Sequence, residues 1–588
     1  MGEKEIKGGE FLFSQVDPQD VFTPEDFDEI HQMVRNTTRD FCRDKVAPRA
    51  DEIEEKEEGV TVGLLREAGE LGLLGNDIPE EYGGDEGDKI SSAVITEALS
   101  FGTSSFGSAF GAHTGIGSLP IVFFGDEEQK KKYLPGIASG ELISAYALTE
   151  PEAGSDALNC QARAELSEDG KYYILNGTKQ YITNAGWADV IIVYAKVDRE
   201  HITTFIVEKD FEGLSIGPEE KKLGIKGSST CSVILEDCKV PVENVLHEVG
   251  KGHEVAFNIL NIGRYKLGPA VVGGAKRSIE LCSDYAMQRY QFKQPIGNFA
   301  MIKEKIADMV IKTFAMESMT YRTAGLMEDK LAEVERDEVV GAIREYAMEY
   351  SMIKVYCTEG YDNICDEAVQ IYGGYGFDQE YPVERNYRDS RINRIFEGTN
   401  EVNRLLIPGT MLPKALKGEL PFMERIGNIK NEIGEAKEKE VPEEPLEMAE
   451  FVLENMKTLF IMAAGNAAQV YQKELQQEQE ILKRLADMAM EIYAVESALL
   501  RTKKMKDDQG EDAVKFPVKI VEVLVSEMIP KMKTWSMEVL VASVGPEKSQ
   551  KMAGGVETLS RCNPLNTFTR KREIADEAYK SKKYFLTE

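Results

Sequence analysis

The sequence is poor in the residues that hold metals and disulfides, and it has no long apolar run. Only eight cysteines and five histidines occur in 588 residues, and no Cys-x-x-Cys pair is present. We therefore predict reduced thiols and no metal site. The clearest apolar run, residues 190–195, is far shorter than the roughly 18 residues of a membrane-spanning helix. The first residues, Met1 to Ile6, contain no apolar signal segment. These absences predict a cytoplasmic protein of bacterial type.

Positive charge is also scarce. Lys and Arg total 70 against 102 Asp and Glu, which gives a formal net charge of −32. Such an excess argues against nucleic acid as a partner. The tail at 570–583 has a local basic excess. We predict that it is a solvated end, and peripheral membrane contact through the C-terminal region is the alternative.

The pattern of apolar residues changes from helical to β and back to helical along the chain. Thr23 followed by Pro24 predicts a helix start. Short runs of β-branched and aromatic residues between turn signals predict a small β barrel or sandwich in the middle, and apolar residues at three-to-four spacing predict helical bundles after it. The predicted class is α+β, mainly α. The expected units are 23–142 (helical), 143–249 (β), 250–425 (helical bundle), 426–445 (linker rich in Glu and Lys) and 446–588 (helical extension).

Four segments carry residue types that suit contact with a bound, anionic ligand. In residues 387–404 arginines crowd a short apolar stretch, and Glu397 then stands beside Gly398 and Thr399, where a tight turn can expose backbone N–H groups. A first-turn helix glutamate is the simpler interpretation of Glu397. Residues 145–156 combine a strand end with a small-residue loop whose N–H and hydroxyl groups can face a ligand. An ordinary capped turn is the alternative interpretation.

Two further segments hold an arginine and a group of glycines. Arg289 is followed by Phe292, and a guanidinium fork suits phosphate oxygens. Gln370 precedes Gly373 and Gly374, which allow a close approach of backbone to a ligand. No Walker motif and no strand-linked Gly-x-Gly-x-x-Gly occurs, so NAD and ATP are not expected as the principal cofactor.

In order and spacing, these segments resemble the acyl-CoA dehydrogenase family over residues 23–413. The extra C-terminal helices are similar to those of its very-long-chain branch, and the resemblance implies the acyl-CoA dehydrogenase fold, FAD as cofactor and Glu397 as the catalytic base. It implies substrate contacts at Ser155, Arg264 and Gly398. It implies flavin contacts at Tyr146, Leu148, Thr149, Gly154, Ser155, Tyr181, Thr183, Arg289, Phe292, Gln370, Gly373, Gly374 and Thr399.

The sequence departs from the family pattern at a few positions. Tyr181 stands where the family usually has Trp, and an aromatic residue on a strand can also be core. Ala300 and Lys303 replace two glutamines of the family pattern, so one side-chain contact is lost and one charge is added. Gly263 occupies the position where some branches place the base instead, which leaves Glu397 for that role.

By resemblance, the expected reaction is α,β-dehydrogenation of a fatty acyl-CoA to trans-2-enoyl-CoA in fatty acid β-oxidation. Electrons would pass to an electron-transfer flavoprotein, and a homodimer would share the flavin across its interface. Small residues at 107–112 predict a deep channel for long or very long chains, although they could simply allow close helix packing. An acyl-CoA oxidase and a non-catalytic acyl-CoA-binding scaffold are the alternatives.

Overall fold

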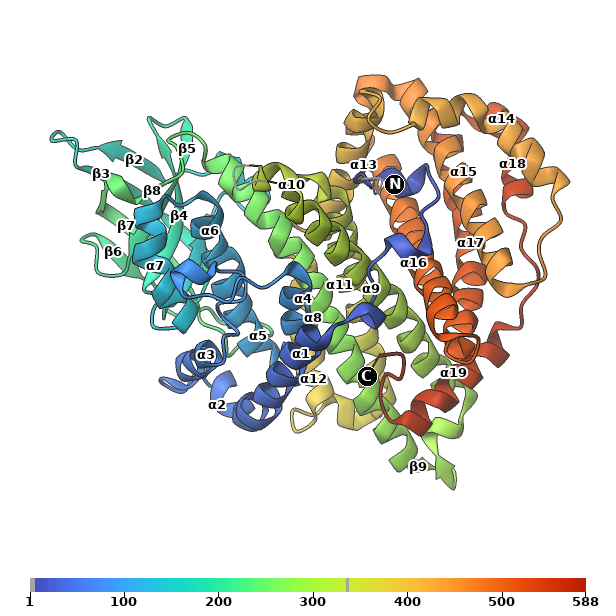
Figure 1. The fold of residues 1–588 in the computed structure, drawn as a ribbon, viewed down its shortest axis with the longest axis horizontal. Coiled ribbons are helices and arrows are strands. Elements are labelled where there is room, and N and C mark those ends of the chain that lie inside the picture. The colour runs from blue at the N-terminus through green and yellow to red at the C-terminus, as the bar shows by residue number, and fades with distance from the viewer. Residues whose placement is uncertain (1–5, 335–337, 588) are drawn as a thin grey trace.

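The structure is a computed structural model that describes residues 6–334 and 338–587. Most of the start of the chain, on which the expectation about a targeting signal rests, lies outside these ranges. Figure 1 shows a β domain at one end of the molecule, long helices through its middle and a second group of helices at the other end. The predicted mainly helical α+β class is therefore confirmed.

Short helices form the first part of the chain. The predicted start at Thr23 gives only a single 3-10 turn, and α1 begins at Glu29 because the Asp28 side chain accepts a hydrogen bond from the backbone N–H of His31. The helices are α1 (Glu29–Phe41), α2 (Ala50–Glu54), α3 (Val60–Glu70), α4 (Lys89–Ala98), α5 (Ser104–Gly111), α6 (Leu119–Phe124) and α7 (Glu127–Ser139).

The middle of the chain forms one eight-stranded sheet. Its order is β6-β7-β3-β2-β4-β5-β8, and β1 pairs with β4 in parallel. The strands are β1 (Ser144–Ala147), β2 (Arg163–Leu166), β3 (Tyr172–Thr183), β4 (Val190–Val197), β5 (His201–Glu208), β6 (Leu214–Ile216), β7 (Thr230–Pro241) and β8 (Val245–Leu246). Alternate residues of β4 contribute to two hydrophobic cores, so the sheet is buried on both faces there.

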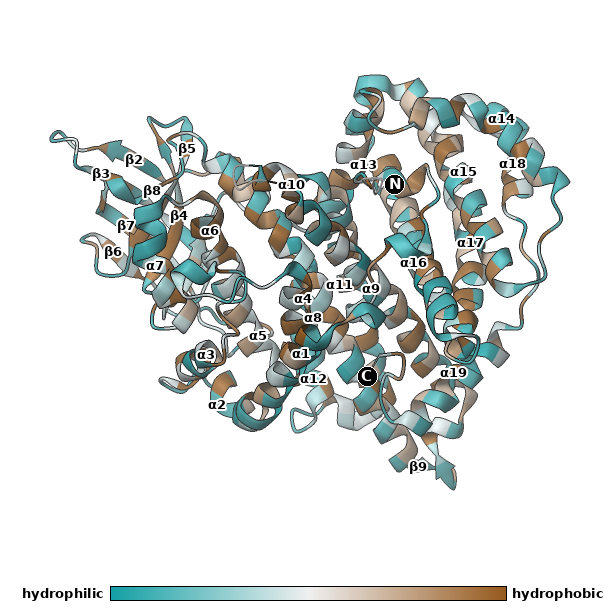
Figure 2. Ribbon diagram, viewed as in Figure 1, coloured by the Kyte–Doolittle hydropathy of each residue, from teal (hydrophilic) through white to brown (hydrophobic). Residues whose placement is uncertain are grey.

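Long helices follow the sheet and carry the candidate base between them. They are α8 (Gly252–Gln288), α9 (Ala300–Ala332), α10 (Val339–Glu345), α11 (Ala347–Tyr372), α12 (Pro382–Ser390) and α13 (Asn400–Leu416). The hairpin of β9 (Tyr290–Gln291) and β10 (Gln294–Pro295) joins α8 to α9. Figure 2 shows hydrophilic and hydrophobic residues along the same helices, as expected for amphipathic elements.

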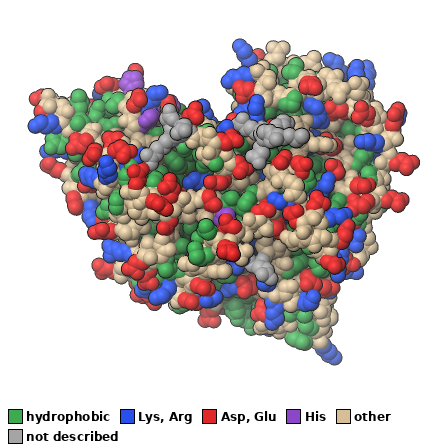
Figure 3. Space-filling view, viewed as in Figure 1, with side chains coloured by type: hydrophobic (Ala, Val, Ile, Leu, Met, Phe, Trp, Pro, Cys, Tyr) green, Lys and Arg blue, Asp and Glu red, His purple; other side chains and the backbone are tan. Residues whose placement is uncertain are grey.

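The C-terminal helices share one hydrophobic core with this bundle. They are α14 (Phe422–Glu438), α15 (Pro445–Tyr471), α16 (Gln479–Gln509), α17 (Lys515–Val544), α18 (Pro546–Leu559) and α19 (Thr567–Ser581). Within the described ranges, no helix has both the length and the apolar character needed to cross a membrane. Figure 3 shows acidic and basic side chains interspersed over the visible face.

Two predictions about this region are wrong. The segment predicted as a linker, 426–445, is mostly helix, and only residues 439–444 separate α14 from α15. The tail is not a solvated end, because α19 packs on α9 and α17. Lys571 is buried and pairs with Asp308 of α9 at 2.7 Å, and Tyr584 is 3% exposed. The tail was predicted to be solvated because its composition is charged, and composition does not reveal that these side chains are buried.

Candidate active site

Glu397 lies in a tight turn between α12 and α13. Its φ is 56° and that of Gly398 is 81°, both in the left-handed region, which a non-glycine residue adopts only at a cost in free energy. The side chain is half-buried, and its Oε2 atom has no hydrogen-bond partner among the described residues. The carboxylate is therefore free to accept a proton from a ligand.

Two cations lie near this carboxylate. Loss of water raises the pKa of Glu397 to about 7, although Arg264 and then Lys354 act to lower it. Burial likewise lowers the pKa of Lys354 to about 7. A carboxyl group with a pKa near neutrality can accept and release protons at ordinary pH, which is what a general base needs.

Arg264 and Lys354 bind the backbone of the turn. Arg264 is buried on α8; its Nε donates to the Glu397 carbonyl at 3.2 Å, and a second guanidinium nitrogen donates to Asn261 at 2.9 Å. Lys354 is fully buried on α11, and its Nζ donates to the Gly398 carbonyl at 2.8 Å. The side chain of Asn403 donates to the same carbonyl at 2.9 Å. The turn is thus fixed from three sides.

The sequence did not point to Lys354, Asn400 or Asn403. Lys354 stands alone in the apolar stretch Ser351–Tyr356, where it matches no motif. The pair Asn400 and Asn403, spaced by three residues directly after the Glu-Gly-Thr turn, was a usable signal, because such side chains can reach back to the carbonyl groups of a preceding turn.

The strand end that was predicted to contact a flavin lies close to Glu397. Tyr146, on β1, is buried, and burial raises the pKa of its phenol well above its ordinary value. Tyr194 and Glu397 raise it further, whereas Arg264 acts to lower it. Leu148 is also buried, and the backbone N–H of Gln180 on β3 donates to the Thr149 carbonyl at 2.9 Å. The loop after β1 is thereby tied to β3.

The remaining predicted residues of this group face open space. Ser155 is exposed, and a Cβ added to Gly154 would have no neighbour within 4 Å. Tyr181 is 60% exposed with a φ of 59°, and Thr183 near it at the end of β3 is half-buried. An exposed aromatic ring is available to stack on a planar ring system.

Thr399 has a structural role in addition to its predicted one. Its hydroxyl oxygen accepts a hydrogen bond from the backbone N–H of Val402 at 3.3 Å and so caps α13. Contact with the flavin through Thr399 stays a prediction.

A second group of predicted residues gathers around the β9–β10 hairpin. The guanidinium of Arg289 lies 5.2 Å from the ring centre of Tyr375, which follows Gly373 and Gly374. Phe292 is 85% exposed, Gln370 is exposed, and added Cβ atoms at both glycines would meet nothing within 4 Å. Open backbone beside a guanidinium fits a phosphate-bearing nucleotide.

One chain does not bring the two groups together. In Figure 1 the β domain with Tyr146 and Tyr181 lies at one end, whereas the β9 hairpin lies at the opposite lower corner.

Of the positions that depart from the family pattern, Ala300 is exposed at the start of α9. Lys303 forms an ion pair with Asp576 of α19.

Comparisons with known proteins identify the family of the chain. Models of the acyl-CoA dehydrogenase N-terminal, middle and C-terminal domains match residues 28–141, 145–238 and 250–412, and a further C-terminal domain model of the same enzymes matches 455–556. A probable acyl-CoA dehydrogenase of Bacillus subtilis is 51% identical over 98% of both chains. The very long-chain specific acyl-CoA dehydrogenase of Bos taurus is 36% identical over 84% of this chain and 78% of its own length.

A crystal structure has the same arrangement over nearly the whole chain. The acyl-CoA dehydrogenase of Bacillus anthracis, solved in complex with FAD, superposes with a TM-score of 0.96 at 51% identity, covering 99% of this chain and 100% of that one. Matches to all of its domains and to a full-length relative at this identity show the family. The chain belongs to the acyl-CoA dehydrogenases.

Proposed function

We propose that the protein removes two hydrogens from long or very long fatty acyl-CoA thioesters and gives trans-2-enoyl-CoA. The observation that carries this proposal is the state of Glu397: its Oε2 has no hydrogen-bond partner in the described part of the chain, and burial raises its pKa to about 7. An α proton of a thioester is only weakly acidic. Its removal therefore needs a base whose pKa is near neutrality and hydrogen-bond donors that stabilise the developing enolate.

Glu397 takes the α proton on its free carboxylate oxygen. The cations Arg264 and Lys354 do not bond this oxygen; they hold the backbone carbonyl groups of the turn instead, which keeps the carboxylate aimed while leaving it basic. By family resemblance, the backbone N–H of Glu397 is one donor to the enolate oxygen. The hydride that leaves the β carbon goes to bound FAD, and this is the chemistry that the cofactor supplies.

The residues that would hold FAD fall into two groups. Tyr146, Leu148, Thr149 and Tyr181 would hold the flavin ring, and Arg289 would bind the pyrophosphate with its fork of donors. Because these groups lie at opposite sides of one chain, we propose a homodimer in which each flavin contacts both subunits. The exposed Phe292 belongs at that interface, since an 85% exposed aromatic side chain is stabilised when a partner covers it.

Preference for long chains rests on the small residues of α5. Apart from its own stretch of helix, a Cβ added to Gly107 or to Gly111 would meet no atom of the described residues within 4 Å, so there is space beside this helix. The 36% identity to a very long-chain specific relative supports the same assignment. We place the reaction in fatty acid β-oxidation, with an electron-transfer flavoprotein as electron acceptor.

Turnover against a ladder of acyl-CoA lengths tests this proposal. We expect the highest rate with chains of palmitoyl length or longer, and a maximum at butyryl-CoA would contradict the chain-length assignment. Reduction of an added electron-transfer flavoprotein without oxygen uptake would support the dehydrogenase, whereas rapid oxygen uptake would indicate an oxidase. A purified protein without flavin colour would indicate a scaffold. Membrane contact stays a prediction that co-sedimentation with anionic vesicles would test.

A further inference from the structure

The turn that carries Glu397 depends on bonds from outside it. Glu397 and Gly398 are successive residues in the left-handed region, and only Gly398 adopts that conformation without a steric penalty. The Gly398 carbonyl accepts from Lys354 at 2.8 Å and from Asn403 at 2.9 Å. Any group that fixes Lys354 therefore helps to fix the turn that carries the base.

Lys354 is fixed by a buried polar chain that leads away from the site. Its Nζ donates to Oδ1 of Asn400 at 2.6 Å, and Nδ2 of Asn400 donates to Oε1 of Glu359 at 3.1 Å. Asn400 is buried, as is Lys354, so loss of one of these bonds would leave a buried polar group unsatisfied.

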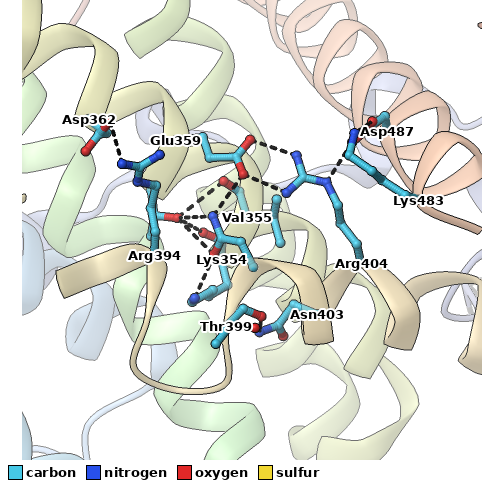
Figure 4. Close-up of polar contacts among 12 residues, drawn as sticks. Lys354, Val355, Glu359, Asp362, Arg394, Thr399, Asn403, Arg404, Lys483 and Asp487 are labelled. Carbon is cyan, nitrogen blue, oxygen red and sulfur yellow. Dashed lines mark hydrogen bonds and ion pairs between the residues drawn. The ribbon is translucent and has the colours of Figure 1, made fainter. Parts of the chain in front are cut away.

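The chain continues into the C-terminal helices. Arg404 of α13 binds both carboxylate oxygens of Glu359, at 2.6 and 2.7 Å, and its Nε donates to Oδ1 of Asp487 at 2.7 Å. Figure 4 shows Arg404 between these two acids. Asp487 is 7% exposed and lies on α16, and its second oxygen accepts from Lys483 at 2.7 Å. An arginine held in this way by two carboxylates has one fixed orientation.

We infer that Asp487 is a positioning residue for Glu397, acting through Arg404, Glu359, Asn400 and Lys354. The C-terminal helices thereby take part in setting the geometry of the base. This inference rests on the proposed function, in which Glu397 accepts the α proton. Without the Asp487 carboxylate, Arg404 loses one of its two anchors in a mostly buried position. Glu359, which binds Asn400, is then paired with an arginine that is held less firmly.

The test compares Asp487→Asn with Asp308→Asn. Both changes replace a carboxylate by an amide and remove an ion pair between the catalytic helices and the C-terminal helices, because Asp308 of α9 pairs with Lys571 of α19 at 2.7 Å. We expect Asp487→Asn to bind flavin normally but to reduce it about tenfold more slowly with acyl-CoA, since small misplacements of a reacting group are costly. Asp308→Asn should reduce flavin at the wild-type rate.

A second measurement does not depend on turnover. Amide hydrogen exchange of the peptide that covers 395–405 should be faster in Asp487→Asn than in wild type and in Asp308→Asn, because the turn opens more often. Asp487→Glu, which keeps a carboxylate, should restore most of the rate and of the protection. Equal exchange in all four proteins would overturn the inference.

A double variant separates positioning from general destabilisation. Lys354→Met and Asp487→Asn act on one chain of contacts, so the double variant should be about as slow as Lys354→Met alone. Multiplying effects would mean that the two residues act independently and would overturn the inference. If Asp487→Asn does not fold, Arg404→Lys serves in its place, because an ammonium cannot bind Glu359 in a fork and also reach Asp487.

Different results would contradict the proposed function and the positioning role of Asp487. Wild-type flavin that no acyl-CoA reduces would contradict the proposed function. Normal reduction in wild type, with equal rates in Asp487→Asn and Asp308→Asn, would contradict only the positioning role.

Discussion

The carboxylate of Glu397 lies directly against the backbone of Gly263. A Cβ added to Gly263 would lie 2.5 Å from Oε2 and 2.7 Å from Cδ of Glu397, closer than such atoms can approach. Glycine at this position therefore makes the room that the proposed base occupies. Gly263, where the resemblance places the base in some branches of the family, is thus a neighbour in space of the proposed base Glu397.

Gly263→Ala is the smallest change that tests this contact. The added methyl group should push the carboxylate aside and slow flavin reduction by acyl-CoA by roughly ten- to a hundredfold. Stopped-flow absorbance measures the rate, and flavin content should stay normal. Gly434→Ala is the matched control, because Gly434 is an exposed glycine of α14 and a Cβ there would meet no other described residue within 4 Å outside its own stretch of helix. Wild-type kinetics in Gly263→Ala would show that the carboxylate does not need this space.

The rate of flavin reduction should rise with pH up to about 7 and then level off. Glu397 must be ionised to accept a proton, and its pKa is raised to about 7 by burial. Lys354 titrates in the same range, so the apparent pKa belongs to the pair.

Lys354→Met tests the direction in which Lys354 shifts the pKa of Glu397. A nearby cation favours the ionised form of a carboxyl group, so its removal should raise the pKa of Glu397 and move the acid limb of the profile to higher pH. Stopped-flow measurement of the rate between about pH 5.5 and 9, the range in which both groups titrate, provides the test. An unmoved limb would mean that Lys354 does not act on the charge of Glu397.

Gly111→Leu should shift the chain-length preference. The open space beside Gly111 would be filled by the new side chain, so long acyl chains should lose turnover while short chains keep it. The ratio of kcat/KM for palmitoyl-CoA to that for a short-chain thioester should fall by at least about tenfold, which corresponds to roughly 1.4 kcal/mol. Gly434→Leu, at an exposed glycine of α14, should leave the ratio unchanged. Equal ratios in both variants would place the channel elsewhere.

Glu317 should be the most costly acid to remove for stability. It is fully buried on α9 and accepts from Arg501 at 2.6 Å and from Tyr584 at 2.8 Å, and it also pairs with Lys276. Glu317→Ala leaves the buried Arg501 and the half-buried Lys276 each short of a partner, which costs about 3–5 kcal/mol of unfolding free energy. Thermal unfolding measures the loss. Arg43→Gln, in an exposed pair, should leave the melting temperature unchanged, and a similarly small effect of Glu317→Ala would contradict the prediction.

Glu317 should also make the stability of the protein depend on pH. Arg501 and Lys276 hold the pKa of Glu317 below its ordinary value of 4.5 although burial acts to raise it. Its contribution is therefore complete above that value and is lost as the pH falls below it. The melting temperature of the wild type should fall more steeply below pH 4.5 than that of Glu317→Gln; parallel curves would contradict this.

The sequence was sufficient to predict the order of helical, β and helical segments and to single out the turn that carries Glu397, because both depend on local patterns; the role of Glu397 as base stays a prediction. Periodicity separates helical from β segments, and the Glu397 turn is a contiguous motif. The linker prediction failed because Glu- and Lys-rich composition is shared by linkers and by surface helices. Ile426, Ile429 and Ile433 recur at helical spacing and pack on the core, and that stripe was the better signal.

The supporting contacts of the base could not be predicted from the sequence. Lys354, Glu359 and Asp487 lie on α11 and α16, up to 90 positions from Glu397 in the sequence, and each has an ordinary residue type for a helix. Only the packing of α13 on α11 and α16 brings them together. The same holds for Lys303, whose partner Asp576 is far away in sequence.

One measurement tests the central claim most directly. Palmitoyl-CoA is added without oxygen to the purified wild type and to Glu397→Gln, and the oxidised flavin absorbance is followed. Our account predicts that the band bleaches in the wild type and persists in the variant, because an amide cannot accept the α proton. Bleaching of Glu397→Gln at the wild-type rate would show that another group is the base.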